Sequence, residues 1–165
     1  MKKLVFALSV LSLLVIVSCG KDDDPTPGLS GTINYNGESY SIKNGIFSLS
    51  ESGGNASGSF FIADGVITSS SSNSVSSSDS NIIITVTATD KNASSLSAGD
   101  YATSTNVPDK FADVSVTTAD GRKEAFTGGT VSISGSGNTY TVAFDVPFGQ
   151  GVTMTGSVSG TYVNL

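Results

Sequence analysis

The sequence has no histidine, no tryptophan and a single cysteine, Cys19. Without histidine the chain lacks the commonest general base and the commonest transition-metal ligand, which excludes Ser-His-Asp and Cys-His nucleophile systems. One cysteine excludes an intrachain disulfide framework and any multi-cysteine metal site. The absence of tryptophan removes the largest aromatic surface for stacking on a sugar ring, which weakens a prediction of sugar binding.

Charged residues are also scarce, at 13% of the chain, and 14 acidic residues outnumber eight basic ones. Loss of Lys2 and Lys3 with a signal peptide would leave six basic groups and a net charge of −8. An acidic surface of this kind repels phosphate backbones and anionic lipid headgroups. We therefore expect no nucleic-acid partner and no electrostatic binding to a membrane surface.

The first eighteen residues have the pattern of a signal peptide. Met1-Lys2-Lys3 is a short positive segment, and only Ser9 and Ser12 are polar in residues 4–17. A membrane-spanning helix needs roughly 20 apolar residues, so this run is short for a permanent span and fits the core of a signal peptide. We predict that residues 1–18 are removed.

Ile16-Val17-Ser18-Cys19 ends this segment and resembles the lipobox of bacterial lipoproteins. The resemblance implies that the Cys19 thiol receives a diacylglyceryl group, that the chain is cut before Cys19, and that the new amine is acylated. Acyl chains such as palmitate contribute roughly 0.8 kcal/mol per buried methylene, so several together hold a protein stably on a membrane. The alternative is an ordinary signal peptide with a chance cysteine, but the chain's single cysteine stands at the end of the apolar run.

An acidic segment, Gly20-Lys21-Asp22-Asp23-Asp24, follows the cysteine and resembles the surface-export signal of Bacteroidota lipoproteins. The resemblance implies passage to the outer face of the outer membrane. The segment also fits a solvated spacer, because runs of like charge are usually extended. Pro25, Pro27 and Gly28 disfavour regular structure. We predict that residues 19–30 are a lipidated tether and that the protein is anchored in the cell envelope, at the outer membrane, and surface-exposed.

Residues 31–165 alternate between apolar and polar side chains, which predicts a single antiparallel β domain. The alternation is clearest in residues 139–146, and residues 152–162 and 82–89 show it as well. One apolar face and one Ser/Thr face are typical of a sheet that is buried on one side. About nine or ten strands of five to eight residues, separated by Gly-rich turns, predict an all-β fold, either a sandwich or a small barrel of about 8–10 strands.

The dipeptide Asn36-Gly37 is favoured in type I′ hairpin turns. A two-residue hairpin around it would place Tyr35 opposite Glu38 and Ile33 opposite Tyr40. Because side chains alternate along a strand, Ile33, Tyr35, Tyr40 and Ile42 then share one face. This register predicts that both tyrosines belong to the core.

Three other segments carry local predictions. Asp64-Gly65 is expected to form a second hairpin turn, between Ser59–Ala63 and Val66–Thr68. Nine of the twelve residues from Ser69 to Ser80 are serine, which predicts a mobile loop. Ala98–Tyr101 is expected to be a turn that enters a short strand.

The carboxylates of the domain are the remaining candidates for chemistry, since pairs of them hydrolyse glycosides in many enzymes. Most lie at expected turns, where aspartate forms local hydrogen bonds. Calcium binding at Asp109 and Asp113 remains an alternative, because calcium prefers oxygen ligands, although two carboxylates make a weak site. We predict no catalytic residue, no metal and no cofactor, so that the protein is not an enzyme. The carboxylates considered are Asp64, Asp90, Asp100, Asp109, Asp113, Asp120, Glu124 and Asp145.

Together these patterns predict a membrane-anchored envelope lipoprotein with a non-catalytic binding, adhesion or accessory role, in which Cys19 carries the lipid. Its partner beyond the membrane would be a surface protein or a glycan. The alternative is a lipocalin-like carrier, in which a barrel encloses a cavity for a small apolar ligand. An open apolar cavity would favour the carrier, and a tightly filled core would favour the first prediction.

Overall fold

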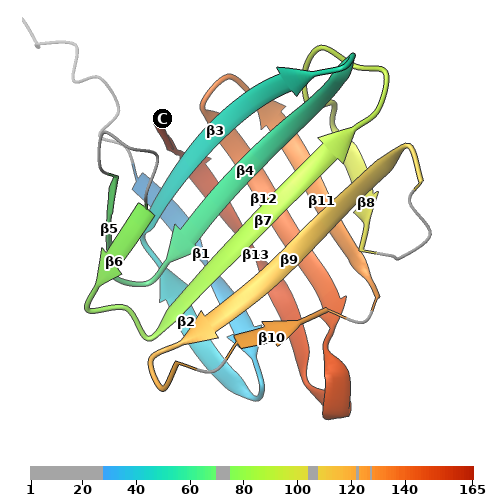
Figure 1. The fold of residues 1–165 in the computed structure, drawn as a ribbon. Helices are drawn as coiled ribbons and strands as arrows, with labels where there is room; N and C mark the ends of the chain where they lie inside the picture. Colours follow the sequence, from blue (N-terminus) through green and yellow to red (C-terminus); the bar gives the residue numbers. More distant parts are fainter. Residues whose placement is uncertain (1–27, 70–74, 104–107, 122, 127) are drawn as a thin grey trace, which may run out of the picture.

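A computed structural model describes residues 28–165, except for residues 70–74, 104–107, 122 and 127. Its regular structure in this part of the chain consists of strands and one 3-10 turn, Gly149–Gly151. The predicted all-β fold is confirmed (Figure 1). In the residues described, no helix has the length and hydropathy that crossing a membrane requires. Cys19 and the predicted signal peptide lie outside these residues.

Fourteen strands are present in the described residues, and six of them reach nine residues, longer than predicted. In chain order they are β1 (Gly28–Tyr35), β2 (Glu38–Ile42), β3 (Asn44–Ser52), β4 (Asn55–Ala63), β5 (Val66–Ser69), β6 (Val75–Ser78), β7 (Ile82–Asp90), β8 (Gly99–Ala102), β9 (Lys110–Thr118), β10 (Lys123–Ala125), β11 (Thr130–Ser136), β12 (Thr139–Pro147), β13 (Thr153–Thr161) and β14 (Val163–Asn164).

Twelve of these strands form one curled sheet, in the order β14-β3-β4-β7-β9-β8-β11-β12-β13-β1-β2, with β10 paired to β9. All neighbours are antiparallel except β14 with β3 and β8 with β9. The sheet curls into a half-barrel (Figure 1), so the architecture is closer to the predicted small barrel than to a sandwich. Strands β5 and β6 form a separate two-stranded sheet.

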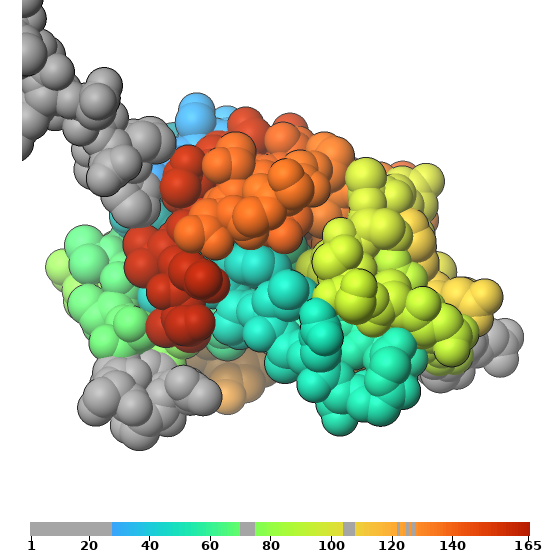
Figure 2. All heavy atoms as spheres, turned by 90° about the horizontal axis from the view of Figure 1, so that it is seen from above, coloured from blue at the N-terminus to red at the C-terminus, as the bar shows by residue number. Residues whose placement is uncertain are grey.

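The two edges of the curled sheet approach each other at Lys43, which joins β2 to β3. The Lys43 carbonyl accepts a hydrogen bond from the Leu29 backbone N–H at 2.9 Å, and the Lys43 N–H donates to the Ala63 carbonyl at 3.3 Å. At one end of the sheet, the C-terminal strand β14 leaves β13 and pairs with β3, where Figure 2 shows it beside the teal atoms of β3. At the other end, β2 pairs only with β1 among the described strands.

Glycines on the concave side of β13 permit the tight curl. Gly156 has φ +123°, and a Cβ atom there would lie 2.2 Å from the Thr32 carbonyl oxygen. Gly160 has φ +142°, and its Cβ would lie 2.3 Å from the Gly28 carbonyl oxygen. Any side chain would collide with β1, so only glycine allows the two backbones to approach this closely.

The concave face of the sheet holds the hydrophobic core. Phe47, Phe60, Tyr140 and Tyr162 form a ring cluster, with centroids of contacting rings between 4.7 and 6.4 Å apart. Strand β7 has the predicted alternation, with every second side chain buried and the others half-buried. Other fully buried side chains include Ile33, Ile42, Ile62, Ile82, Ile84, Val86, Val116, Val131 and Met154.

The predicted hairpin at Asn36-Gly37 is confirmed. Both residues have positive φ, 51° and 82°, as a type I′ turn requires. Strands β1 and β2 pair in the predicted register, with Tyr35 opposite Glu38 and Ile33 opposite Tyr40. Tyr35 is buried, whereas Tyr40 is only partly buried.

The predicted hairpin at Asp64-Gly65 is wrong, because β4 pairs with β3 and β7 while β5 pairs with β6. The Asp64 carboxylate instead accepts hydrogen bonds from Asn81 and Ile82, where the chain returns to the main sheet. The prediction of a loop over Ser69–Ser80 is wrong for Ser69, which ends β5, and for Val75–Ser78, which forms β6. Residues 70–74 lie outside the described residues. A local hydroxyl pair between β5 and β6, at 2.9 Å, joins Thr68 and Ser76.

Two boundaries differ little from the predictions. Gly28 to Ser30, predicted as part of the tether, already belong to the folded domain, because they pair with β13. The expected short strand after Ala98 is present as β8, which pairs with β11.

Candidate functional site

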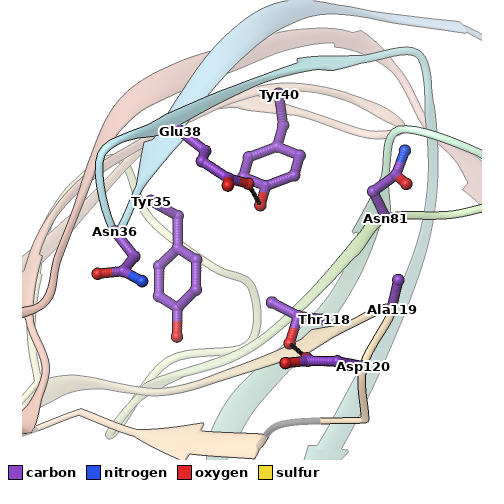
Figure 3. A pocket seen from close by; sticks show the side chains of 8 residues that line it. All are labelled: Tyr35, Asn36, Glu38, Tyr40, Asn81, Thr118, Ala119 and Asp120. Carbon is purple, nitrogen blue, oxygen red and sulfur yellow. Dashed lines mark hydrogen bonds between the residues drawn. The ribbon is translucent and has the colours of Figure 1, made fainter.

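A pocket of about 390 Å³ lies at the end of the sheet where β2 has no second neighbour among the described strands. We call it the seam pocket. Its residues come from the β1–β2 hairpin, from the segment just before β7, and from the end of β9 with the turn that follows (Figure 3). They are Tyr35, Asn36, Glu38, Tyr40, Asn81, Thr118, Ala119 and Asp120.

The β1–β2 hairpin positions one wall of the seam pocket. Glu38 and Tyr40 are two residues apart on β2, so their side chains project from the same face of the strand. The Tyr40 hydroxyl donates a hydrogen bond to Glu38 Oε2 at 2.7 Å (Figure 3). A hydrogen bond to an ionised acceptor is stronger than one between neutral groups, and this one orients both side chains in the pocket.

The hydrogen bond to Glu38 is also the main reason why the pKa of Tyr40 is raised to about 12. Partial burial raises this pKa further, followed by the negative charges of Glu38, Asp64 and Asp120. Three carboxylates therefore act on a single hydroxyl group. Tyr40 remains protonated at neutral pH and serves as a hydrogen-bond donor.

Tyr35 forms a second aromatic part of the same wall. Its side chain is 2% exposed, and its ring packs edge-on against Phe148, with centroids 5.6 Å apart and planes at 85°. Edge-to-face packing fixes the ring orientation. The pocket thus has a rigid tyrosine beside the more exposed Tyr40.

The opposite wall is built by the turn that follows β9. The Gly121 N–H donates to the Thr118 carbonyl at 2.8 Å, and Gly121 has φ +77°, which closes the turn. The Thr118 hydroxyl donates to Asp120 Oδ1. Figure 3 shows Asp120 on the far side of the pocket from Glu38.

Asn81 is held at the base of the pocket by Asp64. Its backbone N–H donates to Asp64 Oδ1 at 2.9 Å, and its side-chain Nδ2 donates to Asp64 Oδ2 at 2.8 Å. The Asn81 carbonyl in turn accepts a hydrogen bond from the Ala119 N–H at 2.9 Å. These bonds connect the start of β7 to the turn after β9.

The described lining residues of the seam pocket carry charge of one sign. Glu38 and Asp120 are exposed carboxylates, and none of the eight lining residues is basic. The pocket therefore combines two negative charges, two tyrosines, two amide side chains and a hydroxyl. This set suits recognition of a polar ligand by hydrogen bonds and ring contacts.

A second hollow, of about 680 Å³, lies between the β3–β4 turn and residues 92–94. Among its described lining residues, Glu51 is the only charged one and none is aromatic. Ligand sites usually combine apolar or aromatic walls with a few polar groups. The seam pocket is therefore the stronger candidate.

The two residues considered for calcium, Asp109 and Asp113, do not lie close enough to share one ion. Asp109 and Asp113 are both exposed. Four residues of extended chain separate them by roughly 13 Å, too far for both to contact one ion at 2.3–2.6 Å. Within the described ranges, no group of three or more histidine, cysteine, aspartate or glutamate side chains could hold a metal ion.

The prediction of local hydrogen bonds at turns is confirmed for Asp120, which accepts from the Thr118 hydroxyl two residues earlier. It is wrong for Asp64 and Asp100. Asp64 accepts from Asn81 and Ile82, and Asp100, inside β8, accepts from the Ser132 hydroxyl at 2.5 Å. Sequence reasoning missed Glu38, which was not among the carboxylates considered, and assigned Tyr40 to the core. The signal was available, because the hairpin register already placed the two side chains on one face.

Comparison of the chain with protein-family models, with curated proteins and with solved structures gives no match. The function of the seam pocket must therefore be argued from its own chemistry.

Proposed function

We propose that the protein is a membrane-anchored lipoprotein of the cell envelope, lipidated at Cys19, whose β domain binds a ligand through the seam pocket. The lipobox-like sequence before Cys19 and the acidic segment Asp22–Asp24 support the anchor and display on the outer membrane surface. The β domain begins at Gly28, so a short tether, residues 20–27, would connect it to the lipid.

One observation carries this proposal: the seam pocket lies at the opposite end of β1 from Gly28, where the proposed tether would join the domain. Strand β1 starts at Gly28 and ends at Tyr35, which lines the pocket. Seven steps of extended chain separate these residues by roughly 23 Å. A domain held by its first strand would keep the anchored end near the membrane and present the pocket to the surroundings.

A binding role fits the groups in the pocket better than catalysis. The chain has no histidine, and Tyr40 is a poor general base because its pKa is raised to about 12. The carboxylates of Glu38 and Asp120 are held by Tyr40 and Thr118 in fixed orientations. Fixed hydrogen-bonding groups around a hollow favour recognition.

The carrier alternative receives less support from the interior of the half-barrel. The ring cluster of Phe47, Phe60, Tyr140 and Tyr162 occupies the space where an apolar ligand would lie. The seam pocket itself is lined mainly by polar side chains. Both features favour a polar ligand at the open end.

The anchor is tested by labelling cells with radioactive palmitate. Wild-type protein and a Ser18→Ala control should incorporate label, and Cys19→Ser should not. Label in Cys19→Ser, or unlabelled wild-type protein in the periplasmic extract, would contradict the proposal.

The orientation is tested with a bulky, membrane-impermeant maleimide on intact cells. A lipidated Cys19 has no free thiol, so an added cysteine would be the only reactive one. Ser39→Cys, on β2 near the pocket, should react faster than Ser159→Cys, on β13 near the tether, and the two rates should converge in detergent. Equal rates on cells, or reaction only after the outer membrane is opened, would argue against pocket-outward surface display.

A further inference from the structure

We infer that Asn36 is a site of spontaneous deamidation, a modification that converts it to aspartate and isoaspartate in the wall of the seam pocket. The chain contains the dipeptide Asn-Gly twice, at Asn36-Gly37 and at Asn44-Gly45. Glycine after asparagine favours this reaction, because it has no Cβ atom to hinder attack by its own backbone nitrogen. The fold places the two dipeptides in opposite environments and so selects one of them.

The reaction needs only the chain and water. The Gly37 backbone nitrogen attacks the side-chain carbonyl carbon of Asn36, and its proton is transferred through water to the amide nitrogen, which leaves as ammonia. This step closes a succinimide ring. Water then adds to one of the two ring carbonyls and breaks its bond to the Gly37 nitrogen. Cleavage at the side-chain carbonyl gives aspartate, and cleavage at the main-chain carbonyl gives isoaspartate.

Both reacting groups are accessible in the turn of the β1–β2 hairpin, where Asn36 and Gly37 are exposed. In a two-residue turn, the flanking residues Tyr35 and Glu38 exchange the last pair of backbone hydrogen bonds, so the Gly37 N–H lies outside the ladder. A Cβ atom at Gly37 would have no heavy atom within 4 Å apart from its chain neighbours. Figure 3 shows no hydrogen bond between the Asn36 amide and the other labelled side chains.

The position of the hairpin in the sheet also favours reaction. Ring closure requires the backbone at Asn36 to rotate, because the nitrogen must reach the side-chain carbon. Strand β2 pairs only with β1 among the described strands, so the turn lies at an edge of the sheet. Local opening costs least at such exposed, weakly connected positions.

Asn44-Gly45 is held in place at the start of β3. The Asn44 Nδ2 donates to the Gly65 carbonyl at 2.8 Å, and the two residues pair with Ala63 and Ile62 of β4. Gly45 is also buried. Ring closure here would break the side-chain hydrogen bond and part of the pairing. Because core strands open far more rarely than exposed turns, Asn44 should react at least about tenfold more slowly than Asn36.

Deamidation would change the seam pocket, since Asn36 is one of its lining residues. Both products add a negative charge to the wall that carries Glu38. Isoaspartate also routes the main chain through its side chain, which lengthens the turn by a carbon atom. A two-residue turn fixes the register of its strands, so the longer turn should open the pairing of Tyr35 with Glu38.

The test follows both dipeptides in one sample. The full chain in detergent is kept in mildly alkaline buffer at physiological temperature and digested with trypsin at intervals, and a sample from the start corrects for reaction during digestion. Cleavage after Lys43 separates the two dipeptides, and mass spectrometry detects the replacement of amide by acid. Asn36 should convert at least about tenfold faster than Asn44 in the folded protein, and the two rates should become similar in urea. No conversion of Asn36, equal rates in the folded protein, or a tenfold difference that persists in urea would overturn the inference.

Asn36→Asp is the matched variant, because aspartate is also favoured before glycine in this turn. The peptide that ends at Lys43 still contains Asn34, and in the variant it should gain no mass. A gain would place the reaction at Asn34 and refute the assignment.

Hydrogen exchange measures the consequence for the hairpin. The Glu38 amide should exchange faster in the isoaspartate form than in fresh protein, and the amide of Val142, a buried residue of β12, should not change. Unchanged exchange at Glu38 would contradict the opening of the hairpin.

Discussion

The Tyr40 hydroxyl donates its hydrogen to Glu38, two residues earlier on the same face of β2, at 2.7 Å. This bond is the largest cause of the raised pKa of Tyr40, about 12. Removing the acceptor charge should therefore lower that pKa. In Glu38→Gln we expect Tyr40 to titrate closer to pH 10, as followed by tyrosinate absorbance and NMR. Glu51→Gln is the control, and an unchanged pKa of about 12 in Glu38→Gln would contradict the assigned cause.

Stability should fall at alkaline pH. The pKa values of Tyr40, Tyr101, Tyr140 and Tyr162 are all raised in the folded protein, the last three mainly by burial. In the unfolded chain tyrosine ionises near pH 10, so above that pH the unfolded state releases protons that the native state keeps.

The free energy of unfolding should thus be insensitive to these tyrosines below about pH 9 and should decrease from about pH 10 upward. Urea unfolding at a series of pH values measures this directly. Stability that stays level or increases through pH 11 would be inconsistent with the raised pKa values.

Removal of the hydroxyl group from two buried tyrosines should change the free energy of unfolding in opposite directions. The Tyr162 hydroxyl has no hydrogen-bond partner among the described residues, whereas the Tyr101 hydroxyl donates to the Ser97 carbonyl at 2.7 Å. Leaving a buried polar group unsatisfied costs about 1–3 kcal/mol. Tyr162→Phe should therefore raise the free energy of unfolding by about 1 kcal/mol, and Tyr101→Phe should lower it by about 1 kcal/mol. Urea unfolding that gave the same sign for both variants would contradict this account of the core.

Asp90 should be the carboxylate on which stability depends most. Asp90 is 6% exposed. Its carboxylate accepts hydrogen bonds from the Ser97 N–H and hydroxyl, and its Oδ2 lies 4.0 Å from Lys110 Nζ. Asp90→Ala would leave these donors without their acceptor, so we expect a loss of about 3 kcal/mol in the free energy of unfolding. Asp113→Ala, at an exposed position on β9, should change it by less than about 0.5 kcal/mol. Equal effects of the two changes on chemical denaturation would refute this role of Asp90.

Local chemistry was sufficient to predict some parts of the fold. The Asn36-Gly37 turn and the alternation of apolar and polar residues around it determined the register of β1 and β2. A two-residue turn sets which residues pair, and the two-residue period of side-chain direction sets which of them face the core. Asp64-Gly65 is a similar dipeptide, but it does not form a hairpin turn. Asp64 there satisfies the backbone N–H groups of Asn81 and Ile82, a contact between residues 17 and 18 positions apart that no local pattern reveals.

The seam pocket shows the same limit for the site. Its walls come from residues 35–40 and residues 118–120, which meet only because the sheet curls until β2 faces the end of β9. The curl depends on glycines such as Gly156, where the backbone of β13 lies close to the backbone of β1. The presence of a glycine in the sequence does not reveal which strand will lie close to it. The sequence pattern therefore predicted the hairpin that carries Glu38 but not the pocket that the hairpin completes.

The lipid anchor at Cys19 is tested most directly by the mass of the N-terminal peptide of protein isolated from membranes of the producing cells. We expect this peptide to begin at Cys19 and to carry a diacylglyceryl group on sulfur and an acyl group on the amine. A peptide that begins elsewhere, or a Cys19 thiol that reacts with iodoacetamide, would contradict the lipid anchor and the pocket-outward orientation derived from it.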